Sequence, residues 1–399
     1  MASNNNKDKC NVPHLRFPEF SGEWNKYTIN DLATVVGGGT PDTTVKSYWG
    51  GDIQWFTPSE IGKNKYVDFS KRTITRDGLD NSSAKLLPLH TILLSSRATV
   101  GECSIASNEC TTNQGFQSLI AKQCNIDFLY YLIQTKKKDL IRNACGSTFL
   151  EISANEIRKI KVAVPVQNEQ EQIAKLLSLI DERIATQNKI IEKLQSLIKG
   201  LVDELMTVLL KGKLYPFSSF YIKAGEGGTP TTSVVEYYTE GTIPFIKIED
   251  LSCKYLTNNK DFITELGMQK SSAWLIPSKS VIYSNGATIG AISINEYPVC
   301  TKQGILGIVP NTNINVEYLY LLMSSSYFSK EISRIITEGT MKTAYLKDIN
   351  HIKCPLPSMA QQKNITNLTS SIEEKLSIEQ ELLRFLNLQK QYLLHMIFI

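Results

Sequence analysis

The most regular hydrophobic pattern in the chain follows Pro165, where apolar side chains recur at spacings that alternate between four and three residues. This heptad spacing places one apolar stripe along a helix and is typical of a coiled-coil seam. From Ile173 to Val208 the seam runs for 208−173 = 35 steps, which predicts a rod of roughly 50 Å at ~1.5 Å per residue. Its positions are Ile173, Leu177, Ile180, Ile184, Gln187, Ile191, Leu194, Ile198, Leu201, Leu205 and Val208.

A second seam with the same spacing lies 192 residues further along the chain. Its positions are Ile365, Thr369, Ile372, Leu376, Glu379, Leu383, Leu386, Lys390, Leu393 and Ile397. Both seams carry a polar residue near the middle, Gln187 in the first and Glu379 in the second. A polar seam residue lowers stability and tends to fix the register of the helices, but a solvated defect would give the same pattern. The sequence leaves these two interpretations open.

Two helices of matching length in one chain most simply pair with each other. The ~145-residue domain between them permits a parallel or an antiparallel pair, and a two-fold relation between the repeats requires the antiparallel one, which we predict. Antiparallel pairing would put the domains at opposite ends of the rod, whereas parallel pairing would put them side by side. Packing of each helix only on its own domain is the alternative, but it does not explain so long a heptad run.

The segments outside the helices also form a repeat, with a period of 189 residues. Such a period is far too long for a solenoid repeat, so each copy should fold as a domain with its own core. The expected divisions are 1–166 and 214–358 for the two domains, and 167–213 and 359–399 for the two helices. The matching segments are Gly38-Gly39-Thr40-Pro41 with Gly227-Gly228-Thr229-Pro230, Ser82–Pro88 with Ser271–Pro277, Arg97–Gly101 with Gly286–Gly290, and Thr112–Gly115 with Thr301–Gly304.

Within each copy, short β-type runs alternate with turn residues and a few helices, which predicts an α+β domain with mixed strands. Helices are expected at 126–143 and 316–336, where apolar residues keep a helical stripe. The clearest strands are 91–94 and 280–283, with the proline-punctuated 160–165 and 352–357 closing the domains. The fold class we predict is therefore α+β: two tandem mixed α/β domains and two long helices forming an antiparallel coiled coil.

Composition favours a soluble, cytoplasmic protein without a membrane partner. The chain has 399 residues and 42% hydrophobic residues, enough for two cores, yet no apolar run of about 18 residues. Its first ten residues are polar and unlike a signal peptide. The eight cysteines include no C-x-x-C pair, so reduced and partly buried thiols are expected.

Charge by itself does not predict nucleic-acid binding. Lys plus Arg minus Asp plus Glu is 20−16 = +4 for 1–166 and zero for each of the other three divisions. A strong non-specific binder of phosphate backbones usually has a larger excess.

Catalytic motifs are missing from the sequence. The glycine segments have no P-loop spacing, no G-x-G-x-x-G follows a strand, there is no H-E-x-x-H, and the four histidines do not repeat between the copies. We therefore predict no catalytic residues and no metal site. The carboxylate and lysine pattern Glu373-Glu374-Lys375 lies on the second long helix, where it is interpreted as a solvated face.

The motifs resemble those of the DNA-specificity subunit of type I restriction-modification enzymes. The resemblance covers both repeats and both helices, and it rests on these segments: Leu15–Phe20 with Gly22-Glu23-Trp24, Gly38–Pro41, Leu94–Gly101, Thr112–Phe116, and Pro165 through Glu169-Gln170. Copy two departs from this pattern: it lacks the opening motif and has Ala360-Gln361-Gln362 in place of Asn168-Glu169-Gln170 and Gly286 in place of Arg97. These differences leave the architecture intact but argue against transferring base contacts residue by residue.

The resemblance implies two target-recognition domains, two helical spacers and no catalytic activity of the chain itself. It further implies a complex on double-stranded DNA with two modification subunits and with restriction subunits. S-adenosylmethionine, ATP and Mg are then cofactors of those partners, and this chain needs none.

Two reading domains on a rod should recognise two half-sites separated by unread base pairs, about one helical turn or ~34 Å apart. Base edges would be read by side chains that donate and accept hydrogen bonds, while Lys and Arg hold phosphates. The candidates are Ser95, Ser96, Arg97, Thr99, Asn113, Gln114, Ser284, Asn285, Thr288, Lys302 and Gln303.

A structural interpretation of these candidates competes with DNA contact. Gly-flanked Ser, Thr and Asn residues commonly build turns, and Gln114 and Gln303, which match between the copies, would then brace the domain. Arg97 is the strongest candidate because its planar fork fits guanine or phosphate. The run Lys136-Lys137-Lys138 fits a phosphate contact or, more simply, a solvated helix end.

Two other functions fit parts of the sequence. A self-contained DNA methyltransferase or nuclease would need a methyl-donor fold and an Asn/Asp-Pro-Pro-Tyr/Phe motif, which the chain lacks. A non-DNA scaffold with two ligand-binding domains on a coiled coil would show no steep loss of affinity with salt.

Overall fold

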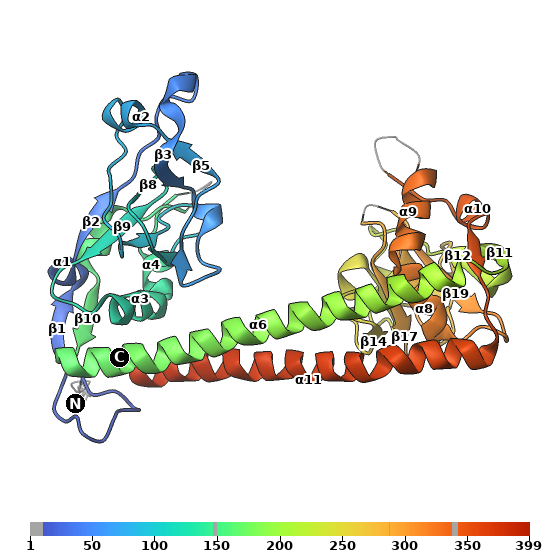
Figure 1. The fold of residues 1–399 in the computed structure, drawn as a ribbon. Coiled ribbons are helices and arrows are strands. Elements are labelled where there is room, and N and C mark those ends of the chain that lie inside the picture. The colour runs from blue at the N-terminus through green and yellow to red at the C-terminus, as the bar shows by residue number, and fades with distance from the viewer. Residues whose placement is uncertain (1–10, 147–149, 287, 337–341) are drawn as a thin grey trace, which may run out of the picture. The chain divides into compact units, whose positions relative to one another are not determined.

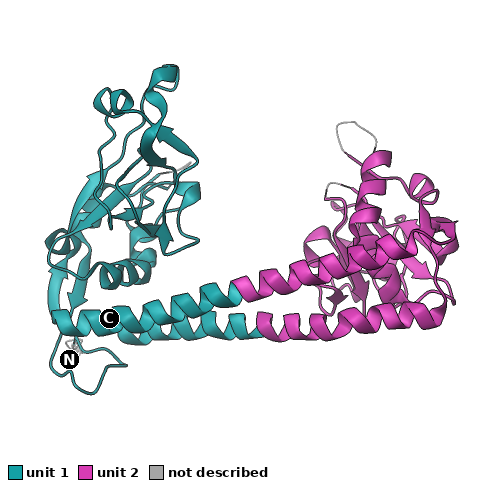
Figure 2. Ribbon diagram, in the orientation of Figure 1, with its two compact units in different colours: residues 1–188, 381–399 teal, residues 189–380 magenta. Residues whose placement is uncertain are grey.

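The computed structural model describes residues 11–146, 150–286, 288–336 and 342–399 (Figure 1). The chain divides into two compact units, which are 1–188 with 381–399 and 189–380 (Figure 2). Both long helices, α6 (Gln167–Leu209) and α11 (Met359–Ile397), contribute residues to both units.

The first unit contains a five-stranded sheet in the order β2-β9-β6-β7-β4, a three-stranded sheet in the order β5-β3-β8, and the pair β1-β10. The central strand β6 is completely buried, as its run Ile92-Leu93-Leu94 predicts for a strand covered on both faces. The strands are β1 (Asn25–Thr28), β2 (Ala33–Gly37), β3 (Trp49–Phe56), β4 (Tyr66–Val67), β5 (Arg72–Ile74), β6 (Ile92–Leu94), β7 (Cys103–Ala106), β8 (Cys110–Thr112), β9 (Gln117–Ala121) and β10 (Lys161–Val164).

The second unit repeats this topology, with sheets in the order β12-β19-β16-β17-β14 and β15-β13-β18 and the pair β11-β20. The predicted α+β fold of two tandem domains is therefore confirmed. Its strands are β11 (Leu214–Pro216), β12 (Tyr221–Glu226), β13 (Ile243–Ile246), β14 (Tyr255–Leu256), β15 (Asp261–Ile263), β16 (Val281–Ser284), β17 (Ile292–Asn295), β18 (Cys300–Thr301), β19 (Ile305–Pro310) and β20 (Lys353–Pro355).

The single helix expected at 126–143 is two helices, and so is the one expected at 316–336. Lys136 leaves the helical conformation between α3 (Ile126–Thr135) and α4 (Lys137–Arg142). Ser325 is extended between α8 (Val316–Ser324) and α9 (Ser326–Ile335), where its hydroxyl accepts from the Phe328 N–H as an N-cap. The hydrophobic stripe continues across both breaks, so periodicity alone did not reveal them. The shorter helices are α1 (Ile29–Leu32), α2 (Arg76–Asp80), α5 (Ala154–Lys159), α7 (Glu265–Gln269) and α10 (Leu346–Ile349).

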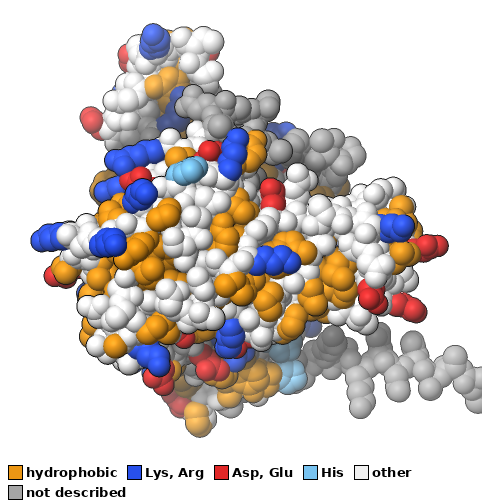
Figure 3. Space-filling view, turned by 90° about the vertical axis from the view of Figure 1, so that its right-hand side faces the viewer, with side chains coloured by type: hydrophobic (Ala, Val, Ile, Leu, Met, Phe, Trp, Pro, Cys, Tyr) orange, Lys and Arg blue, Asp and Glu red, His pale blue; other side chains and the backbone are white. Residues whose placement is uncertain are grey.

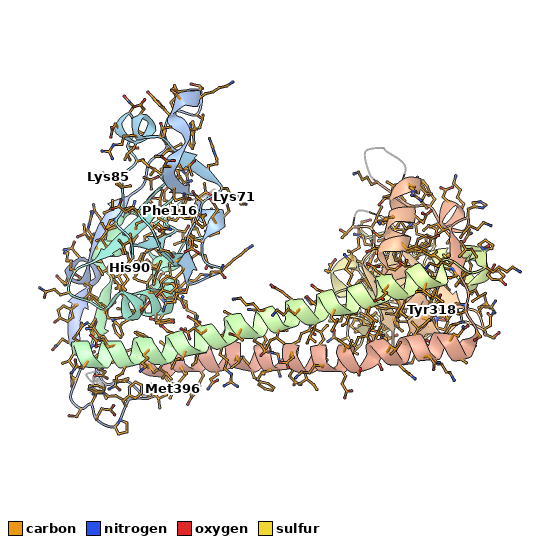
Figure 4. All side chains as sticks on the ribbon, in the orientation of Figure 1. Lys71, Lys85, His90, Phe116, Tyr318 and Met396 are labelled. Atoms are coloured by element: carbon orange, nitrogen blue, oxygen red, sulfur yellow. The ribbon has the colours of Figure 1, made fainter. Side chains whose placement is uncertain are left out.

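The main core of the first unit lies between the five-stranded sheet, α3 and the long helices. Ile173 and Leu177 from the first turns of α6 pack in it together with Ile397 and Phe398 from the end of the chain. A smaller cluster between the two sheets surrounds Phe116, which is completely buried (Figure 4).

Within each unit the two long helices run antiparallel. In the first unit the start of α6 shares a core with the end of α11, and in the second unit Val202 and Met206 near the end of α6 share a core with Ile365 near the start of α11. The antiparallel prediction is confirmed and the parallel alternative is wrong. One seam position was wrong as well: Val208 is 61% exposed, because the end of α6 turns Val202 and Met206 toward the second core.

The polar seam residues Gln187 and Glu379 are buried, 5% and 7% exposed. Neither lies at a solvated gap, so the interpretation of a solvated defect does not hold. Lys390, another polar seam residue, is paired with Asp181 at 2.7 Å within the first unit.

One glutamine in each copy fastens the long helix to the domain that precedes it. The Gln170 Oε1 atom accepts from the Asn125 N–H at 3.0 Å, and its amide donates to the Pro165 carbonyl at 2.9 Å. In copy two the Gln362 Oε1 atom accepts from the Asn315 N–H at 2.8 Å. Since Asn125 and Asn315 are the N-caps of α3 and α8, both fasteners join a domain helix to a long helix.

The seven described cysteines are all free thiols, five of them buried. None of the helices in the described part of the chain is both long and apolar enough to cross a bilayer. Among the same residues, no three His, Cys, Asp or Glu side chains are grouped so that they could hold a metal ion.

Candidate nucleic-acid interface

Two glycines in each copy bring the repeated motifs together in space. The Gly39 N–H donates to the Thr112 carbonyl at 2.8 Å. A Cβ atom at Gly38 would lie 2.0 Å from the Asn113 oxygen, and one at Gly39 would lie 2.3 Å from the Ala84 nitrogen. Both positions therefore require glycine, because the backbone of the Gly-Gly-Thr-Pro segment crosses two other segments at contact distance.

Copy two has the same crossing. A Cβ atom at Gly227 would lie 2.1 Å from the Thr301 oxygen, and one at Gly228 would lie 2.5 Å from the Ala273 nitrogen. The repeated sequence motifs thus mark one junction, where the five-stranded and three-stranded sheets of each domain meet. It is a packing requirement, and it also fixes the loops that leave this junction.

The hairpin between β6 and β7 is the first of these loops. Its turn is held by the Ser95 hydroxyl, which lies 3.0 Å from the Arg97 carbonyl oxygen and 3.0 Å from the Thr99 hydroxyl. Ala98 and Gly101 adopt the left-handed region, with φ of 63° and 89°. This tight turn leaves the side chains of Arg97 and Thr99 exposed.

Arg97 lies at the edge of the hairpin with its side chain 47% exposed, and its Nε atom is 3.6 Å from the Glu151 carboxylate. A partly exposed ion pair of this kind contributes little to stability. The guanidinium can therefore exchange Glu151 for a phosphate or a base edge at small cost.

The second loop is the turn after β8. The Asn113 Oδ1 atom accepts from the Gly115 N–H at 2.9 Å, so this side chain builds the turn. The Gln114 side chain is exposed, and its Oε1 atom accepts a short hydrogen bond from the Thr40 hydroxyl. Thr40 thereby orients an exposed amide that can still donate to a ligand.

The corresponding candidates in copy two also include buried and exposed residues. Ser284 and Asn285 are buried, and the Asn285 amide donates to the Ala344 carbonyl at 3.1 Å. Thr288, Lys302 and Gln303 are exposed.

The structure thus separates the candidates by accessibility. Ser95, Ser96, Ser284 and Asn285 are buried and support the hairpins, so they are not presented to a ligand in this conformation. That any of the candidates contacts DNA stays a prediction. The exposed candidates are Arg97, Thr99, Gln114, Thr288, Lys302 and Gln303.

Other exposed groups of the first domain were not predicted from the sequence. The Arg72 guanidinium stacks on the Trp49 ring at 3.6 Å, and Lys71 and Lys85 are exposed on different sides of the domain (Figure 4). The signal was present in the basic run from Lys71 to Arg76, but it does not repeat in copy two. Thr40 and Thr229 were missed as well, although the repeated motif contains them.

The lysine run 136–138 does not form a basic surface. The Lys136 ammonium donates to the carbonyl of Ile399 at 2.8 Å, and burial lowers its pKa. Lys137 is paired with Glu102, and only Lys138 is fully exposed. On the face that Figure 3 presents, Lys and Arg side chains lie among hydrophobic, acidic and uncharged groups.

The family model of the type I restriction modification DNA specificity domain matches residues 21–196 and again residues 220–387. The chain belongs to this family. Both matches begin in a domain and extend into its long helix, so one specificity domain corresponds to a recognition domain plus its spacer. The family resemblance drawn from the sequence motifs is thereby confirmed.

The chain is similar to specificity subunits of type I restriction enzymes. The chain is 29% identical over 382 residues to the type I restriction enzyme MjaIX specificity subunit of Methanocaldococcus jannaschii, an alignment that covers 89% of this chain and 88% of that protein. It is 29% identical over 175 residues to the EcoR124I/EcoR124II specificity subunit of Escherichia coli, covering 42% and 43% of the two chains.

The fold is shared with solved structures. A crystal structure of the type I restriction-modification S subunit from M. genitalium superimposes with a TM-score of 0.55 at 19% identity, covering 97% of this chain and 99% of that one. A chain from a type I system, solved in work on complex assembly and conformational transition, gives a TM-score of 0.57 at 14% identity and covers 93% and 96%. At these identities the likeness shows the fold alone.

Proposed function

We propose that this member of the type I specificity family is a non-catalytic subunit that reads a bipartite DNA target, one half-site with each domain. The observation that carries the proposal is the duplicated specificity domain, in which the same three motifs build the same junction and present exposed polar side chains twice. Differences between the copies, such as Arg97 against Gly286, then correspond to different half-site sequences.

The unread gap between the half-sites is set by the long helices. α6 has 43 residues, which gives a rod of ~65 Å at ~1.5 Å per residue. A helical rod of fixed length holds two reading domains at a fixed separation, whereas a flexible linker would accept many gap lengths.

The modification subunits dock on the long helices. Several large apolar side chains on those helices are exposed. Such a set of exposed apolar groups is unusual for the surface of a monomeric protein and typical of a protein–protein interface. They are Leu179, Ile190, Leu197, Leu368, Ile378, Phe385, Leu388 and Tyr392. Two modification subunits, one for each specificity domain, fit the duplication, and restriction subunits join this complex.

The partner subunits carry out DNA methylation and cleavage. S-adenosylmethionine serves the modification subunits, and ATP and Mg serve the restriction subunits, so this chain contributes recognition only. The active complex acts on double-stranded DNA in the cytoplasm.

The test is to co-express the chain with a modification subunit and to map methylated bases across a genome. We expect methylation at one bipartite sequence with a constant gap, and no methylation or cleavage by the purified chain alone. Exchanging residues 1–166 with those of a relative should change one half-site and leave the other intact. Catalysis by the isolated chain would support a self-contained methyltransferase or nuclease, and affinity that ignores DNA sequence and salt would support a non-DNA scaffold.

A further inference from the structure

Each copy buries one lysine between its domain and a long helix. Lys65 immediately precedes β4, and Lys254 immediately precedes β14; their side chains are only 10% and 13% exposed. A buried ammonium group is costly unless anions and hydrogen-bond acceptors surround it. The neighbours of these two lysines therefore indicate what they hold together.

In copy one, Lys65 joins the domain to α6. Its Nζ atom lies 2.7 Å from the Asp127 carboxylate on α3 and donates to the Ser178 hydroxyl on α6 at 2.6 Å. The Tyr131 hydroxyl, 3.3 Å from the same Nζ atom, donates to the Asp181 carboxylate on α6 at 2.7 Å. We call these five residues the first lysine cluster.

In copy two, Lys254 joins the domain to α11. It pairs with Glu317 on α8 at 3.7 Å and with Glu373 on α11, and these three residues form the second lysine cluster. Glu373 is only 18% exposed, so the expected solvated face at Glu373-Glu374-Lys375 is wrong for its first residue, while Glu374 and Lys375 are exposed. The reason is a partner that only the fold supplies.

The lysine and the helix carboxylate occupy corresponding positions in the two clusters. Lys65 and Lys254 differ by 189, as the domain repeat does, while Asp181 and Glu373 differ by 192, as the seams do. The tyrosine that follows each lysine donates its hydroxyl to the domain carboxylate, at 2.8 Å from Tyr66 and at 2.6 Å from Tyr255. A contact that recurs across both repeats, through different parts of each, is a feature of the domain and not an accident of one surface.

Each lysine cluster lies further along its long helix than the glutamine, Gln170 or Gln362, that joins this helix to the domain. From Gln170 to Asp181 is 181−170 = 11 residues, and from Gln362 to Glu373 is 373−362 = 11 residues. Eleven residues of helix span ~16 Å. In the first copy Ile173 and Leu177 pack in the core between these two polar contacts. The lysine cluster extends the attachment beyond the core, and a longer attachment restricts the direction of the helix relative to the domain more tightly.

The second copy depends more on its cluster than the first. Leu177, which packs in the first core, corresponds to Thr369, whose hydroxyl bonds within its own helix. The first cluster is also reinforced by Lys390, which pairs with Asp181. The second copy therefore has less apolar packing and no corresponding lysine, since Ile198 occupies that position.

We infer that Lys65 and Lys254 are positioning residues for target recognition, which hold each recognition domain at one angle on its long helix and so restrict the gap lengths that the protein accepts. The inference rests on the proposed function. Neither lysine is expected to touch DNA, because the two side chains are only 10% and 13% exposed. Loosening a cluster should therefore relax the gap while leaving the bases of both half-sites unchanged.

The test uses the chain assembled with its modification subunits and compares methylation of the mapped target with targets whose gap is one base pair longer or shorter. For Lys254→Met we expect the preference for the natural gap to fall by roughly tenfold to a hundredfold, because a misplacement of about 1 Å can cost about a hundredfold in efficiency. Lys65→Met should have a smaller effect. Lys254→Arg, which keeps the charge, should retain the preference.

Lys279→Met is the matched control, because Lys279 pairs with Glu296 on the surface of the same domain and is 60% exposed. Should Lys254→Met fail to assemble, Glu373→Gln tests the same contact with a milder change. A gap preference within about twofold of the unaltered protein in the assembled variants would overturn the inference. Absence of sequence-specific methylation by the unaltered complex would instead overturn the proposed function.

Discussion

Arg16 and Glu169, which are 153 residues apart in the sequence, form a bidentate ion pair with Nε–Oε1 and Nη2–Oε2 distances of 2.8 and 2.7 Å. Glu169 is completely buried, and it also accepts from the indole N–H of Trp24 at 3.2 Å. Beside it, the Leu15 N–H donates to the carbonyl of Met396 at 2.9 Å (Figure 4). The segment Leu15–Trp24 therefore contacts both the start of α6 and the end of α11 and holds them together.

The first prediction concerns the stability of this fastening. Arg16→Met should lower the free energy of unfolding by about 3 kcal/mol, because a buried carboxylate loses its counter-ion. Urea unfolding measures the change. The double variant Arg16→Met with Glu169→Leu should be more stable than Arg16→Met alone.

Arg76→Met serves as the control for the ion pair, since the Arg76 and Asp80 side chains are 70% and 57% exposed. Its effect should stay below about 0.5 kcal/mol. Equal losses in the buried and the exposed variants would contradict the account of Glu169.

The second prediction contrasts two glycines. Gly39→Ala should destabilise the protein by at least about 2 kcal/mol, because the new Cβ atom would lie 2.3 Å from the Ala84 backbone nitrogen. Gly200→Ala makes the same chemical change on α6, where nothing lies within 4 Å, and should stabilise by about 0.5 to 1 kcal/mol. Thermal or urea unfolding compares the two, and changes of the same sign would refute the close crossing at the motif junction.

The third prediction concerns Arg97 in the assembled complex. Arg97→Ala should reduce discrimination at one base pair of the first half-site by about 1 to 3 kcal/mol, as expected for loss of a bidentate base contact. Competition binding with singly substituted targets measures this. Lys159→Ala, which removes an exposed charge paired with Glu156, should leave discrimination unchanged. A uniform loss over all targets, with a shallower salt dependence, would assign Arg97 to the phosphate backbone instead.

The fourth prediction concerns the alkaline stability of the second domain. Burial raises the pKa of Cys300 from its ordinary value of 9.0 to about 11. The folded state therefore keeps this proton after the unfolded state has released it. The resulting contribution to stability is complete below about pH 9 and is lost between about pH 9 and pH 11, at up to about 1.4 kcal/mol per pH unit.

Urea unfolding under reducing conditions from pH 7 to pH 10.5 tests this sign. Cys300→Ala should show a shallower decline above pH 9 than the unaltered chain, whatever its stability at pH 7. A decline of identical slope in both proteins would show that the Cys300 thiol makes no such contribution.

Local patterns predicted what local physics controls. The heptad spacing of Ile173 and Leu177 indicated a helix that buries one stripe, and the repeated Gly38-Gly39 motif indicated two domains of one fold. The family followed from the same motifs. Periodicity failed at Ser325, where a side-chain cap breaks a helix without interrupting the apolar stripe.

Individual contacts could not be predicted in the same way. Glu373 looks like any exposed helix carboxylate until the fold places Lys254 beside it, 119 residues away in the sequence. Ser95 and Asn285 look like accessible hydrogen-bonding groups in loops, yet both are buried within their hairpins. The deciding partner is distant in sequence for Glu373, which pairs with Lys254, and for Asn285, which bonds to Ala344.

The sequence by itself determined the duplication, the two long amphipathic helices and the family. The helices follow from the spacing of nearby apolar residues, and the duplication and the family follow from segments that recur. The tertiary structure decided which way the helices pair within each unit, which loop side chains face solvent and which charges are buried together. These depend on contacts such as Lys65 with Ser178, for which one chain's sequence carries no local signal. Burial and charge pairing are properties of the assembled neighbourhood, and only the folded chain brings that neighbourhood together.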